Sequence, residues 1–330
     1  MKLLVDVSKL QAEGRVTPEQ AADIRRIAAA ETTALAINLL STIGVIAVVA
    51  GIIALEPGTV VMAVLGAAIA TGGLLLKGYR PAGFGFLGSA LVLIGALLHS
   101  GALLIEFEGS ALSFGYVTIV LLALGIVLKQ SLLVALSVFS IAAVLGSSTG
   151  YWHAAYALWV HEPTFTIVVF SLLAFAAYEA SRRVQAAYQK LGRAFALLSI
   201  LWINFGFWVG SIWGDYPGAS WVQSDLLYSE RYGADRYEKL QQWYDQALRI
   251  PSDVFSIVWA AGLLGLGAWA AARNQRAVIN AVATFGAIHF YTQWFERLEA
   301  TPKMVIAAGS IAIAIAFLLW RYNRSRQSPS

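Results

Sequence analysis

Long runs of apolar residues alternate with short polar segments along almost the whole chain. A helix needs about 20 apolar residues to cross the hydrocarbon core of a bilayer, with a range of roughly 17–25. Measured against that length, the pattern predicts an all-α integral membrane protein with about ten spans. The spans are expected at 33–54, 59–76, 82–104, 110–128, 131–149, 163–180, 194–213, 253–272, 278–296 and 302–320.

The connection between the fourth and fifth predicted spans is the shortest in this scheme. Only Lys129 and Gln130 separate 110–128 from 131–149, and connections of two residues between helices do occur. If these spans were one long element, every later segment would change sides. The distribution of charge argues against that alternative.

The basic residues give the spans a direction, because Lys and Arg collect in cytoplasmic loops. With the N-terminus in the cytoplasm, seventeen of the 23 Lys and Arg residues fall in inner segments, and none falls within a span. The short outer loops carry acid instead, at Glu56, Glu106, Glu108 and Glu162. We therefore expect both ends of the chain in the cytoplasm.

Composition supports the membrane assignment and excludes several kinds of chemistry. Hydrophobic residues make up 58% of the chain and charged residues 13%, whereas a soluble domain carries about 25% charged residues. There is no cysteine, which excludes disulfides, thiolate zinc sites and cysteine nucleophiles. The net charge of +4 is carried by loops and indicates orientation. The expected partner is therefore the lipid bilayer and not a nucleic acid.

Residues 1–32 are expected to form a cytoplasmic helical hairpin. Gly14 can supply a left-handed C-cap, and Thr17, Pro18 and Gln20 have the types and spacing of an N-cap, a first helical residue and a capping box. No helix breaker separates the second helix of the hairpin from the first span, so nothing stops it from continuing into the membrane. Charges at Asp6 and Lys9 interrupt the apolar start, so a cleavable signal peptide is not predicted.

A second polar piece, 214–252, divides spans one to seven (33–213) from spans eight to ten (253–320), and a basic tail follows at 321–330. Pro217 and Gly218 indicate a turn, and 234–249 has the apolar spacing of an amphipathic helix. Its aromatic residues could stack on sugars or quinone-like rings. The interpretation we favour is a cap helix anchored on the outer membrane surface.

The ninth predicted span carries the clearest candidate for a polar pathway. His289, Gln293 and Glu296 lie at i, i+4 and i+7 and share one helix face. Polar groups within a span usually face the bundle interior or a water-filled cavity. Asn204 in the seventh span and Asn38 in the first could line the same cavity, which would open outward. In the alternative interpretation Glu296 ends the helix at the interface and the Asn side chains bond neighbouring helices.

Other possible sites are weaker. All four histidines, His99 among them, fall in the outer half of the predicted bundle, but their spacing fits no ligand motif, so no metal or cofactor is predicted. The segment 83–88 matches the dinucleotide pattern G-x-G-x-x-G, yet it opens a membrane span and not a strand–helix turn. Close helix packing explains it better. No catalytic residues are predicted.

The N-terminal run from Leu10 through Gly14 and Thr17 to Ala21, followed by many short spans, resembles the predicted membrane protein family DUF2157. Asn280 opening a late span, the aromatic residues Tyr291, Trp294 and Phe295, and the small residues 307–309 also resemble that family. The resemblance covers the two ends of the chain. It implies a helical architecture and a bacterial cytoplasmic (inner) membrane location, and it implies no established activity.

Three interpretations of function follow. The first is a transporter or small-ligand-binding membrane protein with an outward-facing cavity around His289, Gln293 and Asn204. The second is a sensor or assembly factor that binds protein partners through 214–252 and the N-terminal hairpin. The third is a membrane enzyme acting on a lipid-linked substrate, for which Glu296 and Asp215 are the candidate acids or bases.

Overall fold

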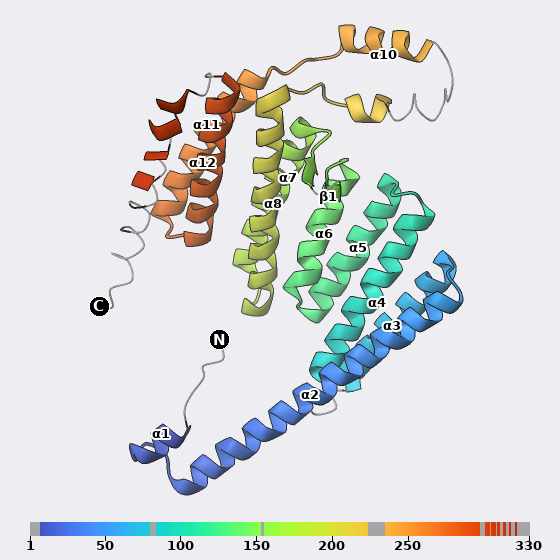
Figure 1. Cartoon of the computed structure of the whole chain (residues 1–330), viewed down its shortest axis with the longest axis vertical. Helices are drawn as coiled ribbons and strands as arrows, with labels where there is room; N and C mark the ends of the chain where they lie inside the picture. The colour runs from blue at the N-terminus through green and yellow to red at the C-terminus, as the bar shows by residue number, and fades with distance from the viewer. Residues whose placement is uncertain are drawn as a thin grey trace. The chain divides into compact units, whose positions relative to one another are not determined.

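The computed structural model describes residues 7–79, 84–152, 155–223 and 235–297, together with parts of 301–321. The chain falls into two compact units, 1–128 and 129–330. The described residues are mainly helical, as the apolar pattern predicts, and Figure 1 shows the helices in chain order. We call the two parts the first and second unit.

The N-terminal hairpin of the first unit has the predicted caps. Helix α1, Val7–Ala12, ends shortly before Gly14, whose φ is +67°. Helix α2, Pro18–Leu55, begins with a capping box in which the Thr17 hydroxyl accepts a hydrogen bond from the Gln20 amide at 3.2 Å. In return, the Gln20 side chain accepts one from the Thr17 amide at 2.9 Å. Because nothing breaks the helix, α2 continues without interruption into the first apolar run.

Helices α3, Thr59–Tyr79, and α4, Gly85–Glu106, pack closely because glycines line their contact. A Cβ atom at Gly66 would lie 2.4 Å from the His99 amide nitrogen, and one at Gly95 would lie 2.4 Å from the Ala70 amide nitrogen. Gly88, the last glycine of the dinucleotide-like pattern, is likewise closed off by Lys77. Close helix packing therefore explains Gly88, as the sequence indicated.

The predicted fourth and fifth spans are separate helices. Helix α5, Ala111–Leu128, is followed by Lys129, which has a φ of +55°, and α6, Ser131–Val144, begins two residues later. The expected extent of the fifth span, 131–149, is wrong at its C-terminal end. Gly146, with a φ of +80°, ends α6 in a Schellman motif, in which the Ser147 amide donates to the Ala142 carbonyl at 2.8 Å.

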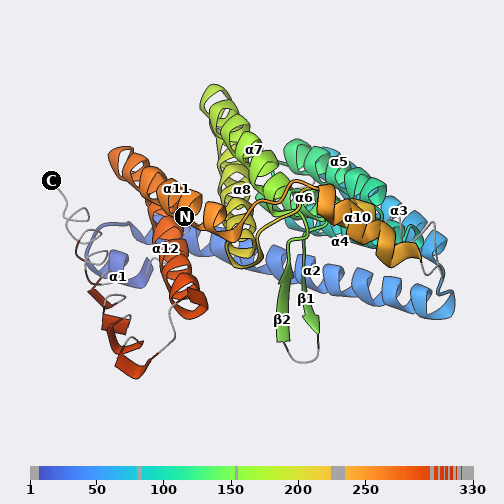
Figure 2. The same ribbon diagram turned by 90° about the horizontal axis from the view of Figure 1, so that it is seen from above.

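A β-hairpin follows α6 and is the departure from the all-α expectation. Strand β1, Ser148–Trp152, pairs antiparallel with β2, Ala155–Trp159, and Figure 2 shows the two strands side by side. The strands are rich in Tyr and Trp, which favour a pleated surface. The positive φ of Gly146 ends the helix before the apolar run ends, so the remaining residues enter the strand.

Four long helices and the shorter α10 follow in the described part of the second unit, and short turns join α7 to α8 and α11 to α12. They are α7, Pro163–Arg183; α8, Ala186–Trp213; α10, Asp235–Gln246; α11, Ser252–Ala272; and α12, Arg276–Arg297. Helices α7 and α8 are antiparallel, as two contacts show. Gly192 near the start of α8 lies against Ser181 near the end of α7, and Gly206 near the end of α8 lies against Ile167 near the start of α7. Helix α10 occupies the position predicted for an amphipathic helix, with Tyr237 exposed.

Aromatic side chains fill the core between α8, α11 and α12. Trp259, Leu263 and Phe285 are buried together, and Phe205 and Phe207 of α8 pack against them. The Phe207 and Trp259 rings are stacked, with centroids 6.4 Å apart. This core fixes the positions of α8, α11 and α12 relative to one another.

Seven helices of the described chain are long and apolar enough to cross a membrane. Many of their apolar side chains are exposed, as expected for surfaces that face lipid. Helix α6 has 14 residues and is shorter than a typical span. The expected tenth span, 302–320, is only partly described. The chain therefore has the helices of a multi-pass membrane protein, while the count of about ten spans stays a prediction.

Candidate functional site

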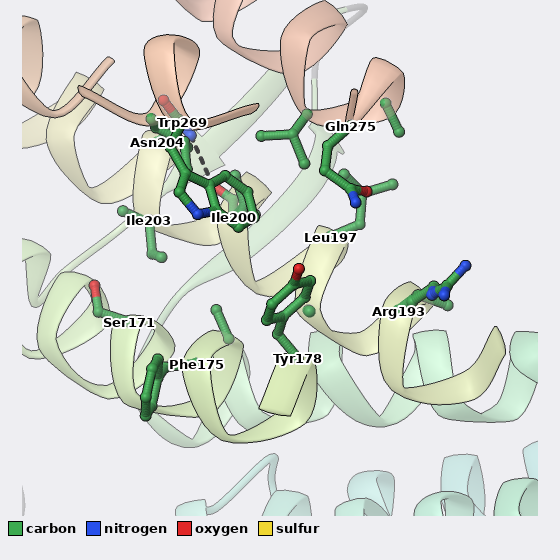
Figure 3. A pocket seen from close by; sticks show the side chains of 16 residues that line it. Ser171, Phe175, Tyr178, Arg193, Leu197, Ile200, Ile203, Asn204, Trp269 and Gln275 are labelled. Atoms are coloured by element: carbon green, nitrogen blue, oxygen red, sulfur yellow. Dashed lines mark hydrogen bonds between the residues drawn. The ribbon is translucent and has the colours of Figure 1, made fainter. Parts of the chain in front are cut away.

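A crevice of about 600 Å³ lies between α7, α8, α11 and the start of α12. It is at the turn end of the second unit, which we define as the end where residues 184–185 join α7 to α8 and 273–275 join α11 to α12. Figure 3 shows the side chains that surround it. Most are apolar, and the polar ones are Ser171, Tyr178, Arg193, Asn204 and Gln275. We call this space the Arg193 crevice.

The spacing of its α8 residues shows how one helix builds the long wall of the crevice. Arg193, Leu197, Ile200 and Asn204 recur every three or four residues and share one face of α8. At 1.5 Å per residue, the distance along the axis from Arg193 to Asn204 is roughly 16 Å. The crevice is therefore a slot that runs along α8, with a cationic side chain at one end and an amide at the other.

Tyr178 and Trp269 bridge the slot from α7 to α11. Their rings meet edge to face, with centroids 5.6 Å apart and an interplanar angle of 74°. In Figure 3 Tyr178 projects into the middle of the space, between Arg193 and the Asn204 end. Of the apolar lining residues, Phe175 is 70% and Leu197 37% exposed. The crevice is consequently open along the side where these two residues lie.

Asn204 closes the deep end and is held rigidly. Its side-chain nitrogen donates to the Ile200 carbonyl at 2.7 Å, and its side-chain oxygen accepts from the Trp259 indole at 2.9 Å. Both Asn204 and Trp259 are buried. An amide has a second N–H and a second lone pair, so Asn204 retains the capacity to bond a group placed in the crevice.

Arg193 supplies the positive charge of the crevice. Within the part of the chain that the structure describes, it forms no ion pair. Glu179, the nearest acid along α7, is already paired with Arg182 at 3.0 Å. The Gln275 amide lies on the same side of the crevice as Arg193, as Figure 3 shows.

Two residues predicted for the polar pathway, His289 and Gln293, do not line the crevice. His289 of α12 packs edge to face on Trp259, with ring centroids 4.7 Å apart. The Gln293 amide atoms are buried and have no hydrogen-bond partner among the described residues. The structure thus brings Asn204 and His289 to the same residue, Trp259, and Asn204 faces the crevice. The side chain of Glu296 lies outside the described residues.

The other two predicted residues, Asn38 and His99, belong to the first unit and join helices there. The buried Asn38 side chain accepts a hydrogen bond from the Leu87 amide at 3.3 Å, which ties α2 to α4. His99 contacts the Ala63 carbonyl at 2.9 Å through Nδ1 and the Tyr116 hydroxyl at 3.1 Å through Nε2. Since a carbonyl can only accept, these contacts assign the proton to Nδ1. Asn38 therefore has the helix-bonding role of the alternative interpretation, and His99 links α4 to α3 and α5.

A second polar cluster holds the segment that follows α8. The Glu162 side chain is fully buried and accepts hydrogen bonds from the Gly218 amide at 2.7 Å, the Ser220 amide at 2.8 Å and the Ser220 hydroxyl at 2.6 Å. Glu162 precedes the first residue of α7. The carboxylate therefore fastens residues 218–220 to the beginning of α7, and we call this arrangement the Glu162 clasp.

Asp215 belongs to the same cluster. Its side chain accepts from the Thr164 amide at 2.9 Å, and its backbone pairs with Ile250 on the far side of the 214–252 insertion. Burial raises the pKa of the Asp215 carboxyl, the negative charge of Glu162 raises it further, and the hydrogen bonds from Thr164 oppose the rise. Asp215 does not line the Arg193 crevice. Its contacts serve to hold the two ends of the insertion together.

The sequence interpretation missed Arg193, Tyr178 and Gln275, and it missed Arg193 because the seventh span was expected to start at 194. Helix α8 begins at Ala186, so Arg193 sits two turns inside the helix and not in a loop. The recurrence of Arg193, Leu197, Ile200 and Asn204 was a signal that could have identified the shared face.

Comparison of the chain with protein-family models, with curated proteins and with solved structures gives no match. The function must therefore be inferred from the geometry of this chain itself.

Proposed function

We propose that this protein is a multi-pass membrane protein that binds a small, largely apolar ligand in the Arg193 crevice. The observation that carries the proposal is the crevice itself, about 600 Å³ between four helices. Ligand pockets in proteins typically have about 300–1,000 Å³, mostly apolar walls and a few polar groups that fix orientation. The Arg193 crevice has these properties.

The open side of the crevice supports an apolar ligand that enters from the bilayer. Phe175 and Leu197 border this opening and are exposed apolar side chains on helices able to cross a membrane. A ligand dissolved in the hydrocarbon core reaches such an opening by lateral diffusion. The walls then cover its apolar part without removing any polar group from water.

The proposed location is the bacterial cytoplasmic membrane, with both ends of the chain and the turn end of the second unit in the cytoplasm. The resemblance to DUF2157 supports the bacterial location, and the basic residues of the turn end support the orientation. Because the chain has no cysteine, a single cysteine can be labelled without background. Gln223→Cys should react with an impermeant maleimide on intact spheroplasts, and Gln185→Cys only after permeabilisation. The opposite pattern would overturn the orientation.

The binding proposal is tested with a neutral single-chain alkyl glyceride that carries a diazirine near the chain terminus. Irradiation of the purified protein in detergent, followed by peptide mass spectrometry, should place the label on α7, α8 and α11. Ala174→Phe adds a ring inside the crevice, because Ala174 lines it, and should reduce labelling at least tenfold.

Ala176→Phe is the matched control, because Ala176 lies on the same helix, is exposed and does not line the crevice. It should leave the labelling unchanged. Labels spread evenly over all the helices, or equal labelling of Ala174→Phe and wild type, would refute the binding proposal.

A further inference from the structure

The charges around the crevice indicate which class of ligand it binds, and this inference rests on the proposed function. The residues 171–204 and 264–285, which contain the whole crevice, hold six basic residues and one acid. The acid is Glu179, and its charge is already balanced by Arg182. The turn end therefore presents a net positive field to any ligand that reaches it.

Arg193 differs from the other basic residues because it lines the crevice. Arg183 ends α7 and Arg273 follows α11, so both lie at helix ends, where the orientation rule for membrane proteins is enough to explain them. Arg193 lies two turns inside α8, on the face that also carries Leu197, Ile200 and Asn204. Because α8 has 28 residues and about 20 cross the hydrocarbon core, Arg193 can lie at the interface, where its exposed side chain reaches lipid headgroups.

We propose that the crevice binds one acyl chain of an anionic lipid from the surrounding leaflet, with the headgroup anion on the Arg193 guanidinium. A guanidinium presents paired N–H groups that match two oxygens of a phosphate or a carboxylate. The Gln275 amide and the Tyr178 hydroxyl lie within the same crevice and can donate to further headgroup oxygens. The apolar wall from Leu197 to Ile203 then covers the chain, which ends near Asn204.

The residues at the open side of the crevice favour a membrane lipid over a soluble anion as the ligand. Arg193 is itself exposed and accessible to either ligand, but the opening of the slot is bordered by the exposed apolar side chains of Phe175 and Leu197, which suit an acyl chain. The opening suits a lipid that places one chain in the slot and leaves the rest of the molecule in the leaflet. Basic pockets between membrane helices on the cytoplasmic side bind anionic headgroups in this way.

The experiment is competition against the neutral diazirine glyceride. Lysophosphatidylglycerol carries a net negative charge and lysophosphatidylcholine carries none, while their single acyl chains can be matched. On the wild-type protein the anionic lipid should displace the probe at a concentration at least tenfold below that of the zwitterionic lipid. Arg193→Gln should abolish this advantage and leave labelling by the neutral probe intact.

Arg183→Gln is the matched control, because it removes the same charge at the same end of the unit from a residue outside the crevice. It should keep the tenfold advantage. Equal competition by the two lipids on the wild type, or an equal loss of the advantage in both variants, would overturn the headgroup assignment. Failure of the neutral probe to label the crevice would instead refute the proposed function, so the two failures are distinguishable.

Discussion

Replacement of Glu162 by alanine tests how the start of the 214–252 insertion is held. The carboxylate accepts three hydrogen bonds, from the Gly218 amide and from the amide and hydroxyl of Ser220. Glu162→Ala leaves these three donors without their acceptor. A donor left unsatisfied in a buried place costs about 1–3 kcal/mol. Gly218 and Ser220 are only half-buried, so water can replace part of the loss, and we expect about 1 kcal/mol for each donor.

The sum of about 3 kcal/mol is a loss of local stability and can be measured by hydrogen exchange. Each 1.4 kcal/mol corresponds to about a factor of ten, so the Gly218 and Ser220 amides should exchange about 100-fold faster. Peptides that cover 214–223 report the effect, and peptides from the middle of α7 should keep their protection. Glu162→Gln, which retains one of the two acceptor oxygens, should give an intermediate rate.

Glu238→Ala is the matched control, because Glu238 is an exposed carboxylate of α10. It should leave exchange in 214–223 unchanged. Exchange of the Gly218 and Ser220 amides in Glu162→Ala within a factor of about two of wild type would refute the reasoning, since the clasp would then contribute nothing to holding the segment.

Three further predictions concern other parts of the molecule. Burial raises the pKa of Asp215 above its usual value of 3.8. The stability of the Asp215 contacts should therefore be full below pH 3.8 and fall as pH rises through the raised pKa. Hydrogen exchange, corrected for intrinsic rates, measures this dependence, and Asp215→Asn should remove it. Asn204→Leu removes the acceptor of the buried Trp259 indole and should lower the stability of the protein by about 1–3 kcal/mol. The loss should appear as a lower Tm in detergent, and an unchanged Tm would contradict this prediction. Gly95→Ala places a Cβ 2.4 Å from the Ala70 backbone nitrogen and should cost about 1–3 kcal/mol of stability. Gly72→Ala, whose Cβ meets nothing within 4 Å, should not destabilise the protein. Equal Tm values for the two variants would refute close packing as the reason for glycine at 95.

The N-terminal cap and the long apolar helices could be predicted from sequence because their causes are local. Thr17, Pro18 and Gln20 form a cap through neighbouring backbone groups, so three residues suffice to predict it. The break at Lys129 was also visible, since a charge between two apolar runs has to leave the hydrocarbon core. The end of α6 was less visible, because the apolar run continues past Gly146 and only the backbone conformation of Gly146 ends the helix.

The polar residues could be located along the chain, but their partners could not. His289 and Asn204 are distant in sequence, and both contact Trp259 because α8, α11 and α12 pack against one another. Glu162 appeared only as an acid in a short loop, and its three donors lie more than fifty residues away. A hydrogen bond of that separation depends on where two helices end relative to each other, which composition and periodicity do not determine.

By itself, the sequence determined that this chain is rich in helices long enough to cross a membrane, because the length of an apolar run and the cost of an unpaired backbone group in hydrocarbon allow little else. The tertiary structure alone decided which side chains surround the Arg193 crevice. The face of α8 that carries Arg193 and Asn204 becomes the wall of a crevice only because α7 and α11 pack next to it, joined by Tyr178 and Trp269. Such a space arises from the packing of several helices, and no single stretch of sequence contains it.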